Sequence, residues 1–323
     1  MTTKVMAFGE ALIDFLSNGA TQAGELESFT KFPGGAPANV AVAVARLGGN
    51  SHFVGQVGDD AFGHFLKDSL NSYGVNTNNM LMTTEAKTAL AFVSLDQTGE
   101  RSFEFYRSPS ADILFRESDF DSKWFTGSKG VFHTCSNTLT DADITRATLA
   151  GVSMARSANW IVSIDVNLRT NLWPNGQVDT QRVIEWMQRG DVVKASLEEL
   201  AVLAEDPFAL IEQTLAAGVT LFVLTDGGNA IRFYTAAYGE SEVVTPKVEV
   251  KDTTAAGDAF VGGLLYKLAE QGGDQASLAT LSKQALVDIV RFAAACGADS
   301  VTKLGAYPSL PSLAEAETQL ERF

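Results

Sequence analysis

Residues 252–260 (DTTAAGDAF) have the residue types and spacing of a site that handles phosphate. The small residues Ala255, Ala256 and Gly257 allow successive backbone amides to point outward where a helix is predicted to begin, near Gly257. Free amides and the positive end of the helix dipole favour a bound anion. Asp258 lies in the first turn beside this cradle. A carboxylate gains nothing from a neighbouring phosphate, but it can accept the proton of an attacking hydroxyl.

Asp258 also has a purely structural interpretation, as an acid favoured at a helix start next to small residues that permit close packing. The spacing alone does not separate the two interpretations. A second Gly-rich turn, residues 34–39 (GGAPAN), enters another predicted helix. Asn39 in this turn, and Asp14 at the end of the first strand region, carry the donors and acceptors that bind sugar hydroxyls. Taken by itself, this turn would be interpreted as a capped strand-to-helix connection.

The elements that must position these residues alternate between strands and helices. Continuous apolar strands are typical of a parallel sheet that is covered on both faces. This alternation predicts an α/β fold with a doubly wound, mostly parallel sheet, whose ligands bind at the carboxyl ends of the strands. The predicted strands are 5–8, 51–57, 161–166, 192–196 and 221–226, and the predicted helices are 37–47, 60–73, 180–189 and 207–217.

Two stretches interrupt the alternation. Residues 14–33 are polar and rich in turns, and residues 88–107 alternate at period two around a turn at 96–99, which is a β-hairpin pattern. We expect a small β-sheet lid formed by about 14–33 and 88–110, within a single domain spanning 1–323. Such a lid would exclude water, which phosphoryl transfer requires. Its exposed sheet could pair with a second copy, so a homodimer through the lid is a further expectation.

Composition limits the function classes. The chain has 323 residues, 46% of them hydrophobic and 20% charged, which is typical of a soluble globular enzyme. Its net charge of −15, without a Lys/Arg cluster, argues against nucleic acid as a partner. Cys135 and Cys296 lie far apart in apolar surroundings and predict buried thiols, and the histidines show no metal-ligand spacing. The absence of a signal peptide or membrane-length apolar run predicts a cytoplasmic protein with no membrane partner.

Three segments resemble, in order and spacing, the signatures of the ribokinase-like (PfkB) carbohydrate kinases: 34–49 (GGAPANVAVAVARLGG), 54–63 (VGQVGDDAFG) and 252–260. The resemblance extends from about residue 6 to 311. Within the family, GGAPANVA together with 102–112 (SFEFYRSPSAD) is similar to the fructokinases and to aminoimidazole riboside kinase. The resemblance implies a ribokinase-like fold and ATP-dependent phosphorylation of a sugar hydroxyl.

D-fructose, giving fructose 6-phosphate, is the first expected substrate. Aminoimidazole riboside, or another sugar or nucleoside acceptor of the family, is the alternative. The choice depends on the shape of the pocket under the lid, around Ala91, Phe103 and Phe105, which the sequence leaves open. A catalytically silent sugar-binding regulator is a different class, but the retained Asp258 and Gly257 argue against it. An NAD-dependent oxidoreductase would need a G-x-G-x-x-G turn after the first strand, which AFGEALIDF lacks.

The resemblance also implies the roles of single residues. Asp258 would be the catalytic base, with an anion hole from the backbone of Ala255, Ala256 and Gly257. Arg169, which ends DVNLR (165–169), would neutralise the charge of the transferring phosphoryl group. Arg169 and Arg107 could instead be surface ion-pair partners, which is less expected for Arg169 because it follows an apolar strand. The expected sugar-binding residues are Asp14, Gly34, Gly35, Asn39, Phe103, Arg107, Arg169 and Asp258.

ATP, Mg²⁺ and a monovalent cation, K⁺, are the implied cofactors. Glu199 matches an acidic residue that orients water around Mg²⁺, and a solvated glutamate at a helix start is its structural alternative. Nucleotide contacts are expected from Lys194, Glu199, Thr225, Gly227, Gly257, Ala295, Gly297 and Ala298. Carbonyls at Asp252, Thr254, Ser300, Lys303, Gly305 and Ser309 would hold the monovalent cation.

The chain departs from the family pattern at four positions. Ala255 replaces a glycine, which requires a backbone conformation that an L-residue can adopt. Ser196 replaces an asparagine three residues before Glu199, which leaves contacts to Mg²⁺ or phosphate there open. Ala294 and Ala230 replace an asparagine and a glycine on the nucleotide side, so a loosened nucleotide preference is expected.

Overall fold

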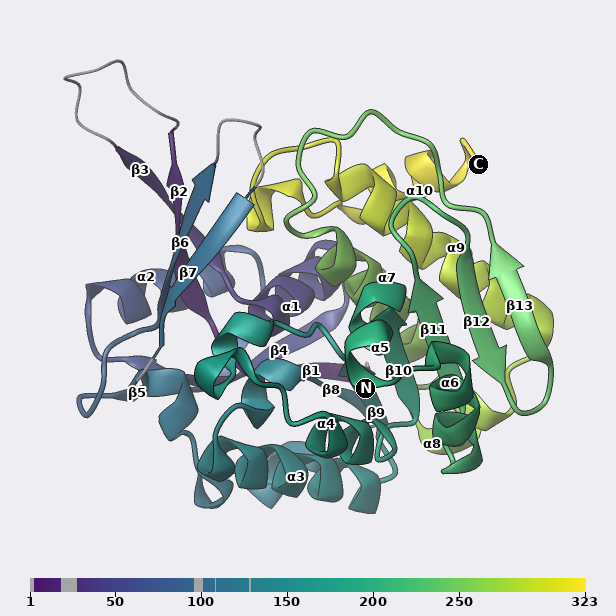
Figure 1. The fold of residues 1–323 in the computed structure, drawn as a ribbon, viewed down its shortest axis with the longest axis horizontal. Coiled ribbons are helices and arrows are strands. Elements are labelled where there is room, and N and C mark those ends of the chain that lie inside the picture. Colours follow the sequence, from purple (N-terminus) through teal and green to yellow (C-terminus); the bar gives the residue numbers. More distant parts are fainter. Residues whose placement is uncertain (1–2, 19–27, 96–100, 108, 128) are drawn as a thin grey trace.

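The structure is a computed structural model that describes residues 3–18, 28–95, 101–107, 109–127 and 129–323. Its main sheet has nine strands in the order β13-β12-β11-β10-β9-β8-β1-β4-β5 (Figure 1). Neighbouring strands from β11 through β5 pair in parallel, whereas β12 and β13 extend one edge in antiparallel fashion. The strands are β1 Lys4–Phe8, β4 Asn50–Gly58, β5 Asn76–Thr83, β8 Gly130–Cys135, β9 Ile161–Asp165, β10 Val192–Ser196, β11 Leu221–Thr225, β12 Ile231–Thr235 and β13 Gly239–Val243.

Helices cover both faces of this sheet, because its central strands are apolar on both sides. One face packs against α3, α4, α5 and α6, and the other packs against α1, α7 and α9 (Figure 1). This arrangement confirms the predicted doubly wound α/β fold. The helices are α1 Ala36–Arg46, α2 Ala61–Ser72, α3 Ala142–Ser157, α4 Thr180–Met187, α5 Leu197–Leu203, α6 Pro207–Ala216, α7 Ala256–Glu270, α8 Gln275–Ala279, α9 Lys283–Ser300 and α10 Leu313–Leu320. Short 3₁₀ turns occupy Ala111–Leu114, Glu117–Asp119, Ser122–Phe125, Ser136–Leu139, Thr170–Leu172, Pro174–Gly176 and Tyr307–Ser309.

A second, four-stranded sheet stands apart from the main sheet, in the order β3-β2-β6-β7 (Figure 1). Its strands are β2 Leu12–Ser17, β3 Phe29–Gly34, β6 Leu90–Leu95 and β7 Arg101–Tyr106. The pair β2–β6 is parallel and the other pairs are antiparallel. The β6–β7 pairing confirms the predicted hairpin, while its turn at 96–99 lies outside the described residues. Asp14 was expected at the end of the first strand; this was wrong, because it lies within β2 of the second sheet.

Aromatic side chains hold the small sheet together. The Phe15 and Phe92 rings on neighbouring strands stack at 5.1 Å between centroids, and Phe29 and Tyr106 meet Phe92 edge-on. Such pairs add to the stability that apolar burial alone gives. Both cysteines, Cys135 and Cys296, are buried and unpaired, as predicted. Within the described ranges, we found no helix whose length and apolar character would let it cross a bilayer.

Candidate active site

The carboxyl ends of the central parallel strands bring together charged side chains from separate parts of the chain. Asp165 ends β9 and Lys194 lies in β10, and their Oδ1 and Nζ atoms are 3.0 Å apart in a buried ion pair. A Cβ atom built on Gly257 would lie 3.6 Å from Lys194 Nζ. The ammonium group therefore lies beside the first turn of α7. The partner carboxylate raises the pKa of Lys194 against the effect of burial, so the group is charged.

The start of α7 has the geometry expected for an anion cradle. Ala255 adopts φ −114° and ψ 15°, which an L-residue reaches without strain, so the replaced glycine is tolerated. The Ala256 amide donates to the Thr253 carbonyl at 3.2 Å. The next two amides, of Gly257 and Asp258, belong to the first helical turn, where no preceding turn supplies an acceptor. The Ala256 amide is therefore bonded within the turn, whereas the Gly257 amide of the predicted cradle and the neighbouring Asp258 amide lie in the first helical turn.

Asp258 is buried, with 7% of its surface exposed. Burial raises the pKa of this carboxyl to about 7, and Asp165 adds to the rise. The hydrogen bond from Asn39 and the charges of Arg169 and Lys194 act in the opposite direction. A carboxyl that titrates near neutrality can accept a proton from a hydroxyl at the pH of most cells.

The two Gly-rich segments of the sequence meet at this carboxylate. Asn39, in the first turns of α1, donates from Nδ2 to Asp258 Oδ2 at 2.7 Å, across 219 residues of chain. Its Oδ1 is buried and has no hydrogen-bond partner among the described residues. Asp14 Oδ2 lies against Gly34, the last residue of β3 and two residues before α1, because a Cβ atom on Gly34 would overlap it. Gly35 has φ +102°, a conformation that favours glycine. The predicted sugar-binding residues Asp14, Gly34, Gly35 and Asn39 thus lie together.

Arg107 and Arg169 have different environments. Arg107 is buried, and its Nε lies 2.6 Å from Asp112 Oδ2, so the alternative of a surface ion-pair partner is wrong for this residue. Arg169 is exposed, and its positive charge acts to lower the pKa of Asp258. Sequence reasoning missed Glu10, a buried carboxylate that accepts from Asn137 Nδ2 at 2.9 Å and interacts with Arg107. Its position directly after the first strand, in AFGE, is the signal that could have identified it.

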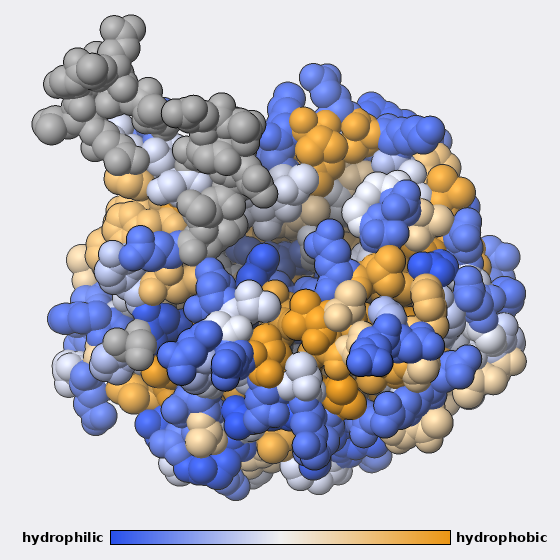
Figure 2. Space-filling view, viewed as in Figure 1, coloured by the Kyte–Doolittle hydropathy of each residue, from blue (hydrophilic) through white to orange (hydrophobic). Residues whose placement is uncertain are grey.

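The other sugar-site expectations are only partly placed. Phe103 lies in β7, but its side chain lies outside the described residues. In the expected pocket, Ala91 is buried in β6 and Phe105 packs against a small apolar cluster with it. Figure 2 shows a recess near the centre of the face in view, bordered by both hydrophilic and hydrophobic side chains.

A cavity of about 520 Å³ adjoins the start of α7. Most of the predicted nucleotide contacts line it, namely Lys194, Thr225, Gly227, Gly257, Gly297 and Ala298. The remaining wall is largely apolar, from Ile231, Pro246, Val248, Val250, Phe260, Ala294 and Val301. Ala295 is buried within α9 and is not part of the described lining, and neither is Glu199. An apolar slot next to an anion cradle has the composition of a nucleotide site.

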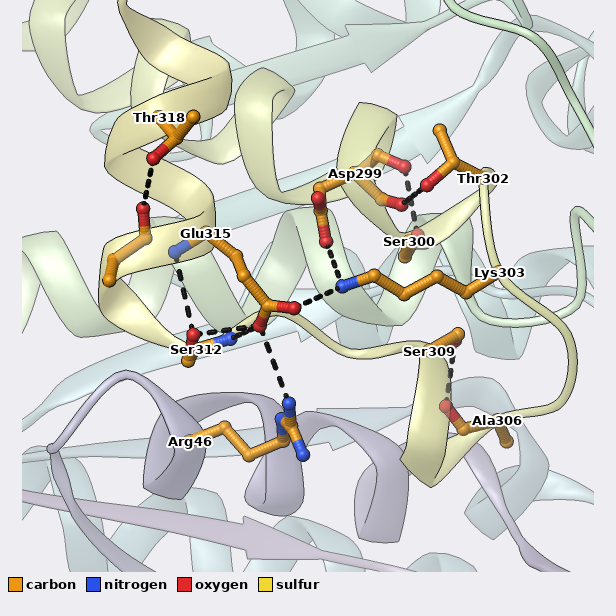
Figure 3. Close-up of polar contacts among 12 residues, drawn as sticks. Arg46, Asp299, Ser300, Thr302, Lys303, Ala306, Ser309, Ser312, Glu315 and Thr318 are labelled. Atoms are coloured by element: carbon orange, nitrogen blue, oxygen red, sulfur yellow. Dashed lines mark hydrogen bonds and ion pairs between the residues drawn. The ribbon is translucent and has the colours of Figure 1, made fainter.

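The predicted cation loop is partly assembled. Asp252 Oδ1 accepts from the Thr254 amide at 2.8 Å, and Asp252 Oδ2 accepts from the Gly305 amide at 2.9 Å, so these two segments are joined. Lys303 extends its side chain toward Asp299 and away from this loop (Figure 3). Ser309 Oγ donates to the Ala306 carbonyl. Lys303 could therefore reach a cation only through its backbone carbonyl, whereas the Ser309 hydroxyl oxygen keeps lone pairs that could also coordinate one. The described residues contain no cluster of three or more acidic, His or Cys side chains that could hold a metal ion.

The chain belongs to the pfkB family of carbohydrate kinases, which it matches over residues 2–313. It is similar to two proteins named fructokinase-2. The one from Zea mays is 39% identical over 317 residues, covering 97% of this chain and 92% of the relative. The one from Solanum habrochaites is 39% identical over 321 residues, covering 98% and 96%.

Solved structures of fructokinases and of an aminoimidazole riboside kinase are similar to this chain over almost its whole length. A crystal structure of fructokinase with bound ATP from Xylella fastidiosa has a TM-score of 0.93 at 45% identity, covering 100% of this chain and 99% of that one. A double mutant of fructokinase from Vibrio cholerae, with fructose, ADP and potassium ion bound, has a TM-score of 0.86 at 34% identity, covering 99% and 98%. Aminoimidazole riboside kinase from Salmonella enterica, complexed with aminoimidazole riboside and an ATP analogue, has a TM-score of 0.84 at 31% identity, covering 98% and 100%.

Proposed function

We propose that this protein is a fructokinase that transfers the γ-phosphoryl group of ATP to the 6-hydroxyl of D-fructose. The observation that carries the proposal is the position of Asp258, which is buried at the start of α7 with Asn39 on one side and Lys194 near the other. The similarity to fructokinases over nearly the whole chain supports fructose as the acceptor. In Vibrio cholerae fructokinase, fructose and ADP are bound together.

Each group at the site can be given a role in the proposed phosphoryl transfer. Asp14 and Asn39 would bind sugar hydroxyls next to Asp258, which takes the proton of the attacking hydroxyl. The amides of Gly257 and Asp258, with Lys194, would stabilise the negative charge on the transferring phosphoryl group. Arg169 would add a positive charge from the solvent side. The small sheet would act as a lid that excludes water, and its exposed strands would allow a homodimer.

ATP would lie in the 520 Å³ cavity, with its base against the apolar wall. Mg²⁺ is expected to bind together with the nucleotide. Glu199, the residue expected to orient water around Mg²⁺, accepts hydrogen bonds from the backbone amides of Leu168 and Ser196. We propose K⁺ at the loop joined by Asp252, since backbone carbonyls there are the oxygen ligands that such a cation prefers. Cytoplasmic residence remains a prediction, drawn from the sequence.

The test is an ADP-release assay with D-fructose, D-glucose, D-ribose and aminoimidazole riboside, each in K⁺ and in Na⁺ buffer. We expect the highest kcat/KM with fructose and higher turnover in K⁺. Phosphorus NMR of the product would identify the hydroxyl that carries the phosphate. Aminoimidazole riboside is the second candidate, because a kinase for it shares the fold at 31% identity. Full turnover with the riboside and none with fructose would reject the fructokinase assignment.

A further inference from the structure

The segment that carries Arg169 has a backbone conformation that its surroundings must impose. Val166 to Arg169 follow β9 directly, at the carboxyl edge of the sheet. Asn167 is buried and has φ +35°, in a region that residues other than glycine seldom adopt. Such a conformation persists only where neighbouring groups hold it. The position of the Arg169 guanidinium therefore depends on what holds residues 166–168.

Three hydrogen bonds hold this segment, one at each residue before the arginine. The Val166 amide donates to the Lys194 carbonyl at 2.9 Å. Ser136 Oγ donates to the Asn167 carbonyl at 3.3 Å. The Leu168 amide donates to Glu199 Oε1 at 3.0 Å. The last of these is charge-assisted and adjoins Arg169 itself, so it constrains the arginine most directly.

Glu199 uses its second oxygen at the start of its own helix. Glu199 Oε2 accepts from the Ser196 amide at 2.7 Å, and the Glu199 amide donates to Ser196 Oγ at 3.2 Å. This is a capping box, in which the first and fourth residues of a helix start satisfy each other's amides. Ser196, which departs from the family's asparagine, suits this N-cap position. The reciprocal bond fixes the carboxylate, and the fixed carboxylate in turn holds Leu168.

These contacts give Glu199 a role in addition to the one that the family resemblance implies, because each carboxylate oxygen that accepts from an amide keeps a second lone pair. Both oxygens accept from backbone amides, and Glu199 is absent from the described residues that line the 520 Å³ cavity, whereas Lys194, five residues earlier, lines it. We propose that Glu199 is a positioning residue: its carboxylate fixes the 166–168 segment and thereby holds Arg169 at the phosphoryl-transfer site. The catalytic consequence rests on the proposed kinase activity, but the structural link to Leu168 does not.

The first measurement needs no turnover. Hydrogen–deuterium exchange of peptides that contain Leu168 is followed in EDTA without nucleotide, for the wild type, Glu199→Gln and the control Glu198→Gln. Glutamine has one acceptor oxygen and can satisfy only one of the two amides. We expect faster exchange over 166–169 in Glu199→Gln, and wild-type exchange in Glu198→Gln, since Glu198 is exposed on the same helical turn. Unchanged exchange in Glu199→Gln would overturn the proposal.

The second measurement is a double-mutant cycle with Arg169→Ala on kcat for fructose phosphorylation. A misplaced transition-state group costs roughly ten- to hundredfold in rate. We expect a loss of that size from Glu199→Gln alone and little further loss once Arg169 is absent, because the two residues act through one effect. Multiplicative losses would overturn the proposal. If fructose is not the substrate, the wild type itself will be inactive in this assay, while the exchange result still decides the structural link.

The third measurement separates positioning from an interaction with Mg²⁺. Glu199→Asp keeps the negative charge but is one methylene too short to reach both amides. We expect it to resemble Glu199→Gln, with a Mg²⁺ concentration for half-maximal rate within about twofold of the wild type. A large rise in that concentration in Glu199→Gln, with recovery in Glu199→Asp, would assign Glu199 to the metal and reject the positioning role. Since Glu199→Asp retains a carboxylate at the helix start, it also serves if Glu199→Gln fails to fold.

Discussion

At the scale of single residues, the Asp258 side chain is buried, yet it must carry a negative charge to accept a proton from the sugar hydroxyl. Its pKa near 7 means that the folded protein keeps a proton on this group well above the ordinary value of 3.8. Ionising it in a buried site costs free energy that folding elsewhere must offset. Asn39, Arg169 and Lys194 reduce this cost without removing it. We therefore expect the buried Asp258 carboxylate to lower the free energy of unfolding while it makes the site reactive.

The substitution Asp258→Asn should separate these two effects. We expect kcat to fall by about 10²-fold or more, because the base is lost. Stability should rise: the folded pKa lies above the unfolded one, so the wild type loses stability as the pH rises from about 4 to about 7, and asparagine does not. The free energy of unfolding in urea, measured at several pH values, should show a gain that grows over this interval and is constant above it. A gain that does not change with pH would contradict the assignment of this pKa to Asp258.

Asn39 should set the pH at which the enzyme becomes active. Its hydrogen bond favours the ionised form of Asp258, so Asn39→Ala should raise the pKa of that carboxyl further. The ascending limb of kcat/KM for fructose would then move to higher pH. Asn78→Ala, an exposed asparagine on β5, is the control and should leave the limb in place. A limb that stays at the wild-type pH in Asn39→Ala would mean that another group controls it.

At the scale of elements, the contact between α1 and α7 decides whether Asn39 reaches Asp258. The two helices cross where Gly262 of α7 meets Ala43 of α1, and a Cβ atom on Gly262 would overlap the Cβ of Ala43. Such close approach of two helix backbones requires small residues on both sides. The sequence motifs at the two helix starts can therefore act together only because small residues further along each helix let them pack.

Gly262→Ala should destabilise the protein by about 1–3 kcal/mol through overpacking, although alanine is the better helix former. Adding Ala43→Gly removes the opposing Cβ atom and should restore most of the loss. The free energy of unfolding in urea is measured for both single variants and for the double variant. The sign of the coupling is diagnostic: if the double variant is less stable than either single variant, the two side chains do not oppose each other as the structure indicates.

At the scale of the whole molecule, an ion-pair network joins parts of the chain that are far apart in sequence. Lys303, just after α9, contacts Asp299 at 2.6 Å and Glu315 of α10 at 2.8 Å, and Glu315 also contacts Arg46 of α1 at 3.5 Å (Figure 3). The loop that follows Lys303 binds Asp252 through the Gly305 amide, just before the anion cradle. The C-terminal helix is thereby linked to α1 and to the segment that leads into the site.

Glu315→Gln should cost about 1 kcal/mol or less near neutral pH, because the side chain is 42% exposed and partly screened. Lys303 and the Ser312 contacts lower the pKa of Glu315 to about 2 from 4.5, so its contribution is present above 4.5 and is lost as the pH falls toward 2. Urea unfolding near pH 7 and near pH 3 should show the difference from wild type shrinking at the lower pH. Exposed Glu321 provides the control variant, Glu321→Gln. Equal losses at both pH values would exclude an ionic contribution.

The sequence by itself determined the features that depend on neighbouring residues. Apolar runs predicted β9, β10 and β11 to within a residue, and small residues predicted the start of α7. These follow from local periodicity and from the chemistry of helix starts, which a short window contains. The turns formed by the two Gly-rich segments could be predicted from their local residue types. The fold class could be predicted from the alternation of strand and helix patterns along the chain.

Only the tertiary structure decided which distant groups meet. Asn39 bonds to Asp258, Arg107 turns inward to Asp112, and Glu199 binds the amides of Leu168 and Ser196. The antiparallel edge strands β12 and β13 were also found only in the structure, from their hydrogen-bonded pairing, and not from the hydrophobic pattern of the sequence. Hydrogen bonds and ion pairs across the chain depend on how elements pack, and periodicity does not encode the partner of a given side chain.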